Sequence, residues 1–339
     1  MKRILVFALK LAVTFGGIGW VALSMADELT REQDALVEMI RDADVLWLLG
    51  ALAVTAVSMA LSGLQWWILL RRQGIGLSLY ETQKCYFVGL FFNTFMPGNA
   101  GGDAKKVYDV YRGAKDLAGG FTATLFDRVF GLFMLDVIGM AAGFWMARTT
   151  PATAPALMPI VWIFAGMCLF FAAVFSRRLG AFAVRALGAL RLRKFAEAFD
   201  SIRRRFHLYR DPKLWAGLLS LSGFIQFTRV LIHWMLAVAV GLEAPFVAFL
   251  YFVPLLGVVS ALPISVGGFG PREALAQSLF ALVAFTPVES FVLTELSVLV
   301  VVLVSLPGGV AFLTAQSRPV PEESPADEKR MHGKEGEGR

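Results

Sequence analysis

The sequence predicts an all-α polytopic membrane protein with about eight transmembrane helices, in which re-entrant or broken helices form a pseudo-repeat of two halves. Three observations predict this fold class. First, 57% of the 339 residues are apolar and only 17% are charged, whereas soluble domains have about 45–50% apolar and about 25% charged residues. Second, the apolar residues form runs close to the ~20 residues that cross ~30 Å of hydrocarbon. Third, one Pro-Gly-Gly spacing recurs where two apolar segments are interrupted.

Seven apolar stretches are long enough to be predicted as full-length spans. They are 4–25, 45–70, 119–147, 157–176, 214–241, 246–262 and 288–313. The stretch 264–286 is also long enough, but glycines and a proline interrupt it, so it is predicted as a broken span. The run 86–96 has eleven residues and would reach only about 16 Å, roughly half of the hydrocarbon core. Because basic residues flank this run on both sides, it is predicted as a re-entrant hairpin from the cytoplasm, which leaves eight crossings.

The charged connections predict the orientation and the domains. The connection 26–44 carries seven acids and two arginines, so it is predicted outside; 177–213 carries eleven basic residues and three acids, so it is predicted in the cytoplasm. Both termini are then cytoplasmic. Residues 1–316 are predicted to form one transmembrane domain with a cytoplasmic amphipathic segment at 177–213, and 317–339 a disordered cytoplasmic tail. The N-terminus is similar to a signal peptide, but its apolar run is long, so an uncut first helix is predicted.

One apolar helical face occurs within the cytoplasmic segment. Its members are Phe195, Phe199, Ile202, Phe206 and Tyr209, at steps of four, three, four and three residues. A basic amphipathic helix of this kind lies in the membrane interface and favours anionic lipid. A helix that packs on the end of the bundle would show the same pattern, so both interpretations stay open.

The recurring pattern is the most informative feature of the sequence. The spacing from Pro97 to Gly101 and Gly102 equals the spacing from Pro263 to Gly267 and Gly268, and each doublet is followed by an acid (Asp103 or Glu273) and a base (Lys105 or Arg272). Broken helices survive in hydrocarbon only where they line a cavity or are buried in protein. Paired interruptions in two halves of a membrane protein indicate a binding site at the repeat interface, where restarting helices direct amides at an anion. The alternative is two tight turns at helix ends.

Charged residues within the predicted spans indicate a polar pathway. A charged side chain at mid-helix costs roughly 2.5–3.5 kcal/mol on the insertion scale, so such residues usually face the interior of a bundle. Asp127 and Arg128 lie well inside one span, and Arg229 lies deep in another. Ser222, Gln226, Arg229 and His233 follow at steps of four, three and four, which predicts a polar stripe along one side of that helix.

These features predict a substrate-binding groove. Its candidate residues are Asn93, Pro97, Gly98, Gly101, Gly102, Asp103, Lys105, Asp127, Arg128, Gln226, Arg229, His233, Pro263, Gly267, Gly268, Gly270, Arg272 and Glu273. No metal site or cofactor is expected, because the two cysteines and three histidines show no ligand spacing. Nucleic acid is not expected as a partner, because the basic residues gather in loops between apolar segments.

Three motifs carry a resemblance to a known family. Residues 93–98 (NTFMPG) with Gly101-Gly102-Asp103 resemble the first signature of the lysylphosphatidylglycerol synthase transmembrane-domain family, also called flippase-like membrane proteins. Residues 127–132 are similar to its intramembrane arginine motif, and 262–273 to its third signature. The resemblance covers about residues 1–315 and implies an eight-span domain with re-entrant segments. In founding members this domain moves an aminoacylated phospholipid outward, after a soluble C-terminal domain has made it.

The resemblance and the charges together lead to a functional hypothesis. The protein is expected to be a flippase-like transporter of an anionic lipid head group, from a phospholipid or a polyprenyl-phosphate-linked molecule, in a bacterial inner membrane. Only a short polar tail follows the domain, so the aminoacyl transfer of the founding members is not expected, and neither is an enzyme. The expected partners are anionic membrane lipids, with a homo-oligomer or a lipid-synthesis enzyme also compatible. The alternatives are a membrane-embedded lipid-modifying transferase and a non-transporting partner subunit of a lipid or cell-envelope enzyme.

Overall fold

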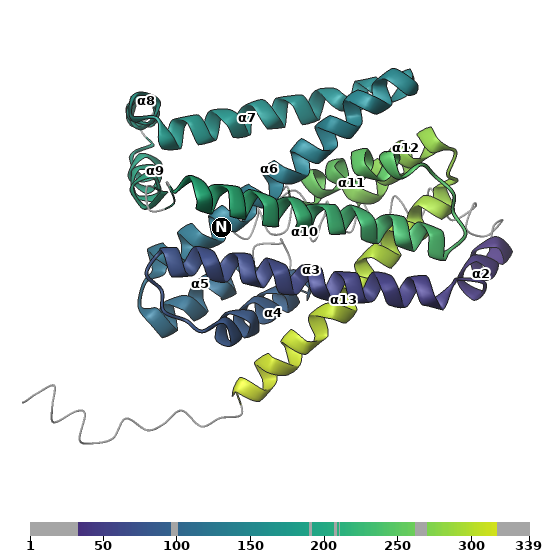
Figure 1. Ribbon diagram of the computed structural model, residues 1–339, viewed down its shortest axis with the longest axis horizontal. Helices are drawn as coiled ribbons and strands as arrows, with labels where there is room; N and C mark the ends of the chain where they lie inside the picture. The colour runs from purple at the N-terminus through teal and green to yellow at the C-terminus, as the bar shows by residue number, and fades with distance from the viewer. Residues whose placement is uncertain are drawn as a thin grey trace, which may run out of the picture.

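The computed structural model describes residues 33–95, 101–189, 192–206, 209, 211–261 and 270–316 (Figure 1). These residues form helices and no strands. The predicted first span 4–25 and the predicted tail 317–339 lie outside the described residues. So do five candidate site residues, namely Pro97, Gly98, Pro263, Gly267 and Gly268.

Five helices among the described residues are long and apolar enough to cross a membrane. They are α3 (Val45–Arg72), α6 (Leu117–Thr149), α7 (Leu157–Phe175, preceded by the 3-10 turn η1, Pro151–Ala156), α10 (Pro212–Ala239) and α13 (Pro287–Gln316). Three of them begin at an aspartate whose side chain accepts a backbone N–H: Asp44 from Leu46, Asp116 from Gly119 and Asp211 from Lys213. These caps satisfy amides that the first helical turn leaves unpaired. The predicted spans at these positions are confirmed.

Helices α3 and α10 lie antiparallel at the centre of the bundle (Figure 1). At one end the Asp44 amide donates to the Ala239 carbonyl at 2.7 Å. At the other end the Gln73 side chain donates to the Tyr209 hydroxyl at 2.8 Å. The second end carries the basic connection 177–213 and is called the basic end below, and the first is called the opposite end.

A first helical hairpin enters the bundle from the basic end. It consists of α4 (Leu79–Phe95) and α5 (Gly101–Ala114), whose 17 and 14 residues reach only about 25 and 21 Å. Gly102 near the start of α5 lies against Gly89 and Asn93 of α4, and Leu77 before α4 lies beside Gly113 near the end of α5. The two helices are therefore antiparallel, as the predicted re-entrant hairpin requires. Helix α4 begins seven residues before the predicted run because Ser78 and Glu81 form a reciprocal cap.

A second hairpin enters from the opposite end. It consists of α11 (Phe246–Ala261) and α12 (Pro271–Phe280), followed by the short turn η3 (Ala281–Val283). Phe280, the last residue of α12, packs on Phe249 and Phe252 near the start of α11, with ring centroids 5.7 and 5.6 Å apart. The sequence predicts 246–262 and 264–286 as two crossings, whereas the structure pairs the two short helices α11 and α12 antiparallel to each other. The second hairpin thus mirrors the first, as in an inverted repeat.

Two short helices lie across the basic end, where α7 ends and α10 begins (Figure 1). They are α8 (Arg177–Ala189) and α9 (Arg193–Phe206), and a further short helix, α2 (Gln33–Arg41), precedes α3 at the opposite end. The predicted apolar face of α9 is divided. Phe206 and Tyr209 are fully buried against Phe126 of α6, whereas Phe195 is 67% exposed. The end of this segment packs on the bundle, and its beginning leaves an apolar side chain on the surface.

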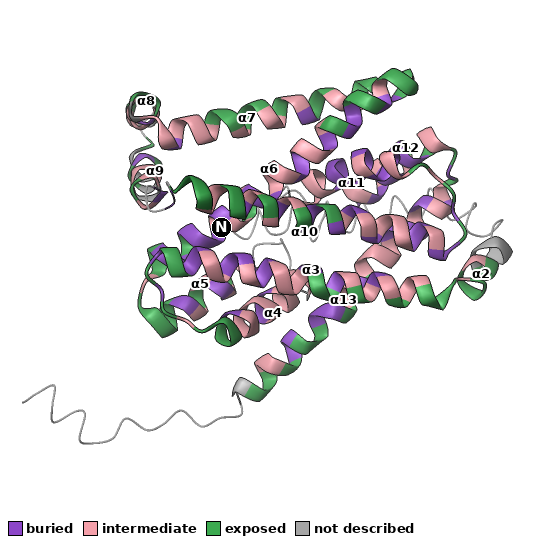
Figure 2. Ribbon diagram, viewed as in Figure 1, coloured by how far each residue is buried: buried purple, intermediate pink, exposed green. Residues whose placement is uncertain are grey.

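The buried side chains gather in the central helices, and α7 shows mainly intermediate and exposed residues (Figure 2). Trp162 and Leu169 of α7 are 72% and 64% exposed. Apolar side chains that face outward are expected for a helix in contact with acyl chains. The charged residues described next lie between α3, α4, α5 and α6.

Candidate functional site

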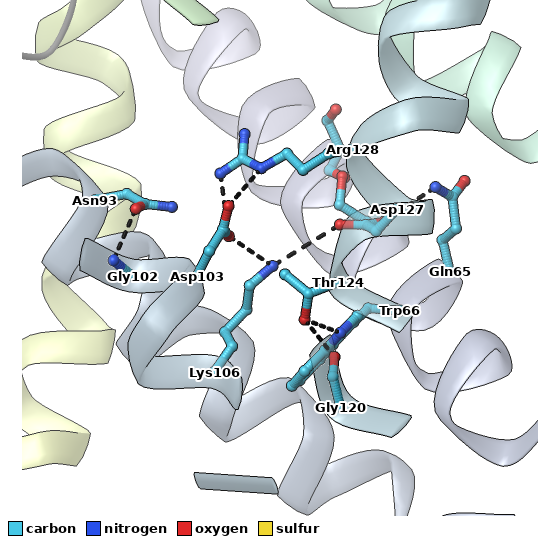
Figure 3. A network of polar contacts seen from close by, with 12 residues as sticks. Gln65, Trp66, Asn93, Gly102, Asp103, Lys106, Gly120, Thr124, Asp127 and Arg128 are labelled. Carbon is cyan, nitrogen blue, oxygen red and sulfur yellow. Dashed lines mark hydrogen bonds and ion pairs between the residues drawn. The ribbon is translucent and has the colours of Figure 1, made fainter. Parts of the chain in front are cut away.

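A cluster of charges joins the first hairpin to α6 (Figure 3). Asp103 and Lys106 are one turn apart on α5, so both face the same side of that helix. On α6, Arg128 donates to Asp103 through Nε at 2.8 Å and through Nη2 at 3.2 Å, which makes a two-pronged contact. Lys106 Nζ lies 3.2 Å from Asp103 Oδ1 and 3.8 Å from Asp127 Oδ2. The structure therefore brings the predicted residues Asp103, Asp127 and Arg128 together.

Lys106 is the buried cation of this cluster. Its side chain is 4% exposed, compared with 49% for Arg128. The ammonium group lies 5.1 Å from the ring centroid of Trp66 and 4.8 Å from that of Tyr86, within the range in which an aromatic face attracts a cation. The two carboxylates and the two rings together compensate a charge that would be costly in hydrocarbon.

The cluster continues through side-chain hydrogen bonds to α3 and α10. Gln65 of α3 donates to Asp127 at 3.0 Å, and its carbonyl oxygen accepts from Ser222 of α10 at 2.7 Å. Trp66 donates its ring N–H to Thr124 of α6 at 3.1 Å. These bonds connect three helices, α3, α6 and α10, through buried polar groups, as is typical of helix contacts within membranes.

Small residues allow the hairpin helices of this site to approach closely. A Cβ at Gly102 would overlap the Gly89 carbonyl oxygen and the Asn93 side chain, so only glycine fits. The amide of Gly102 donates to Asn93 Oδ1 at 2.8 Å (Figure 3). Asn93 thus occupies one of the amides that open α5. The predicted anion-binding role of this helix start would have to use other amides.

The predicted polar stripe of α10 has different partners along its length. Gln226 is 6% exposed, and its Oε1 has no hydrogen-bond partner within the described residues. His233 hydrogen-bonds through Nδ1 to the Arg229 carbonyl at 2.9 Å. Arg229 is half-buried beside Gly257 of α11, and in the described part of the chain it forms no ion pair.

The second hairpin holds a separate group of charges. Glu273 is 5% exposed and accepts from the Gly270 amide at the start of α12, where the φ of +88° at Gly270 favours glycine. Arg272 donates through Nε to Glu273 at 2.9 Å, and its Nη2 lies 3.4 Å from Glu295 of α13. The predicted residues Gly270, Arg272 and Glu273 therefore lie together, in a cluster whose described members include two acids and one base.

Two lysines that are adjacent in the sequence have different environments. Lys105, the predicted ligand, pairs with Asp109 one turn further along α5 and lies 5.6 Å from the ring centroid of Phe312. Lys106, which is not among the predicted ligands, is part of the charge cluster. Gln65, Trp66 and Tyr86 were also missed. A signal for Gln65 exists in the sequence, because Ser58, Ser62 and Gln65 form a polar stripe along an otherwise apolar span.

Arg229 has no acidic partner among the described residues, whereas the charges around Arg128 pair with one another. Arg128 and Lys106 both lie within ion-pair distance of Asp103, and Lys106 Nζ also lies 3.8 Å from Asp127 Oδ2. An arginine without a carboxylate partner inside a membrane protein indicates a place for a ligand of opposite sign. No group of three His, Cys, Asp or Glu side chains that could hold a metal ion occurs in the described ranges.

Comparison with known proteins agrees with this architecture. No curated protein and no solved structure matches the chain. The family described as Lysylphosphatidylglycerol synthase TM region matches residues 7–309, which include both hairpins and all five long helices apart from the last residues of α13. The chain is a multi-pass membrane protein, and it belongs to the lysylphosphatidylglycerol synthase TM region family.

Proposed function

We propose that this protein moves an anionic lipid head group across the bilayer along the polar side chains around Arg128 and Arg229, while the acyl tails stay in the membrane. The head group belongs to a phospholipid or to a polyprenyl-phosphate-linked lipid. The protein acts as a transporter and not as an enzyme, and its partners are the membrane lipids themselves.

The physical need for such a protein comes from desolvation. A phosphate that enters hydrocarbon loses its hydration, and the cost of burying an isolated ion is far larger than that of burying a neutral polar group. Fixed cations and hydrogen-bond donors reduce this cost when they replace the water. The side chains of Arg128 and Arg229 provide such cations within the helical bundle.

The lack of an acidic partner for Arg229 among the described residues is the observation that carries the proposal. A group with one negative charge, such as a phosphodiester, would provide a partner for this half-buried arginine beside Gly257. The Arg128 side chain is 49% exposed, so a ligand can reach it, whereas Lys106 is enclosed. Guanidinium groups bind phosphate oxygens through two parallel N–H bonds.

The charged ends of the bundle support an orientation. The connection 177–213 carries eleven basic residues, and cytoplasmic loops are enriched in Lys and Arg. We therefore place the basic end in the cytoplasm of a bacterial cell, with the protein in the inner membrane. The first hairpin would then enter from the cytoplasm and the second from outside.

Reconstitution in liposomes tests the proposed function. Transbilayer movement of fluorescent anionic and zwitterionic lipids would be measured for the wild type, Arg128→Ala and Arg229→Ala, with the folded fraction of each checked by thermal unfolding. Each variant should lose at least about tenfold in the rate for the anionic lipid, the loss expected for about 1.4 kcal/mol of stabilisation. Arg148→Ala is the matched control, because Arg148 is an exposed arginine in the last turn of the same α6.

The outcomes separate the proposal from its alternatives. Movement that is unchanged in both folded arginine variants would overturn the proposed route. Release of a chemically altered lipid would favour a lipid-modifying transferase. Absence of any movement by the wild type, with the lipid still bound, would favour a partner subunit for another enzyme.

A further inference from the structure

The contact between Asp103 and Arg128 has the two-bond geometry with which arginine also binds a phosphate. Both carboxylate oxygens accept from the guanidinium, at 2.8 Å from Nε and 3.2 Å from Nη2. Arginine binds carboxylates and phosphates through the same fork of parallel N–H donors. Asp103 therefore occupies the donors that a head-group phosphate would use.

Asp103 has a second cationic partner, Lys106, which stays beside it if the Arg128 side chain moves away. Lys106 Nζ lies 3.2 Å from Asp103 Oδ1, on the same helix and one turn away. The rings of Trp66 and Tyr86 enclose this ammonium group, so it stays in place independently of Arg128. If Arg128 turned to another anion, the Asp103 charge would still be compensated.

The two cations also differ in how a ligand can reach them. The side chain of Arg128 is 49% exposed, that of Asp103 is 22% exposed, and that of Lys106 is 4% exposed. A head group can therefore approach Arg128 and compete for its N–H donors, but it cannot approach Lys106. The cluster consists of one accessible cation, one enclosed cation and a carboxylate shared between them.

We propose that Asp103 is an internal substitute for the head-group phosphate: it holds the Arg128 fork in the empty protein, and an incoming phosphate displaces it while Lys106 retains it. This proposal rests on the proposed function and adds how Arg128 is occupied in the empty protein and released when the ligand binds. After the exchange, the phosphate pairs with Arg128, and Lys106 serves Asp103 and Asp127, which also accepts from Gln65.

Asp103→Asn tests the displacement directly. Asparagine keeps the shape of the side chain but weakens its hold on Arg128, so a phosphate meets less competition. The purified full-length protein in neutral detergent would be titrated calorimetrically with dihexanoyl phosphatidylglycerol, dihexanoyl phosphatidylcholine and inorganic phosphate. The anionic lipid should bind about tenfold more tightly to the variant, which corresponds to about 1.4 kcal/mol. The zwitterionic lipid should show a smaller change.

Asp109→Asn is the matched control for this measurement. Asp109 lies on the same α5 and forms an ion pair, but its partner is Lys105 and not Arg128. Its removal should leave the affinity unchanged. A gain for the lipid alone identifies the ligand as a lipid head group, and a gain for inorganic phosphate as well identifies the phosphate group itself; both support the displacement.

Lys106→Gln provides a second, independent test. Without Lys106, release of Arg128 would leave Asp103 as an uncompensated buried charge, so the anionic lipid should bind about tenfold more weakly. A folded Asp103→Asn protein that binds no more tightly than the wild type, or a folded Lys106→Gln protein with wild-type affinity, would overturn the displacement. If Arg128→Ala still loses binding in that case, the proposed function stands and only the role of Asp103 is wrong. If Arg128→Ala binds like the wild type, both proposals are wrong.

Discussion

Gln65 shows how a single residue joins helices inside the membrane. Gln65 is 2% exposed, and its side-chain amide makes two hydrogen bonds: it donates to Asp127 and accepts from Ser222. The same side chain thus supports the carboxylate of the charge cluster and satisfies a hydroxyl group on α10. Hydrogen bonds between transmembrane helices average about 0.6 kcal/mol and reach about 1.7 kcal/mol each. Two such bonds on one side chain are a measurable part of the stability.

We expect Gln65→Leu to destabilise the protein by about 1–3 kcal/mol, because it removes both bonds and leaves the Ser222 hydroxyl buried without its partner. Thermal unfolding in detergent, followed by the intrinsic fluorescence of the protein, would measure the change in the free energy of unfolding. Gln83→Leu is the matched control, because Gln83 makes one described bond, to the Ala60 carbonyl, and its Oε1 has none among the described residues. Equal losses of stability in the two variants would show that the second hydrogen bond of Gln65 adds nothing to the free energy of unfolding.

At the scale of elements, α9 is attached to the start of α6. Arg205 of α9 donates to both oxygens of Asp116, at 3.0 and 3.1 Å, and Asp116 caps α6 through the Gly119 amide. Burial raises the pKa of Asp116, but the bonds from Gly119 and Arg205 and the charge of Arg205 outweigh it, so the pKa lies below its ordinary value. The contact therefore stabilises the ionised carboxylate at the helix start, where the helix dipole also favours negative charge.

This contact predicts a pH-dependent loss of stability. Because the folded pKa of Asp116 is lowered, the contribution is complete above the pKa of an unfolded aspartate, about 3.9, and is lost as the pH falls through the lower folded value. Arg205→Ala should cost about 0.5–1 kcal/mol near neutral pH, as expected for a partly exposed pair. Thermal unfolding at a series of pH values should show the wild type and this variant converging below about pH 4. Arg204→Ala is the control, since Arg204 is 70% exposed and pairs within α9. A stability difference between the wild type and Arg205→Ala that stays constant with pH would exclude Asp116 as its cause.

At the scale of the whole molecule, two helical hairpins enter the bundle from opposite ends, and each packs against long helices (Figure 1). The sequence predicts the long helices well, because an apolar run of this length has few other stable structures. The predicted 45–70 and 214–241 correspond to Val45–Arg72 and Pro212–Ala239. The pairing of α11 with α12 was not predictable in the same way. The predicted stretches 246–262 and 264–286 are long enough for two crossings. The packing of Phe280 on Phe249 and Phe252 shows that the chain returns to the same end.

The site was predictable as a set of motifs but not in its pairings. Charges within spans predict Asp127 and Arg128 as members of a polar region, and the structure shows Arg128 in contact with Asp103 and Asp127 close to Lys106. Adjacent residues of an α-helix point in directions about 100° apart, so only one of Lys105 and Lys106 can face α6. The sequence of α5 alone does not contain the position of α6. Pairings of this kind arise from tertiary packing, so they appear only once the helices are placed together.

The hairpin arrangement predicts which loops share a side of the membrane. Glu243 lies between α10 and α11, and Ala281 follows α12, so both belong to the opposite end, whereas Lys213 begins α10 at the basic end. In a protein with Cys85 and Cys168 replaced by Ser, a membrane-impermeant maleimide added to intact cells should label Glu243→Cys and Ala281→Cys. Lys213→Cys should react only after permeabilisation, because the proposed orientation puts the strongly basic connection before α10 in the cytoplasm. Labelling of Glu243→Cys and Ala281→Cys from different sides would contradict the second hairpin, and a reversed pattern at all three positions would keep the hairpin but invert the proposed orientation.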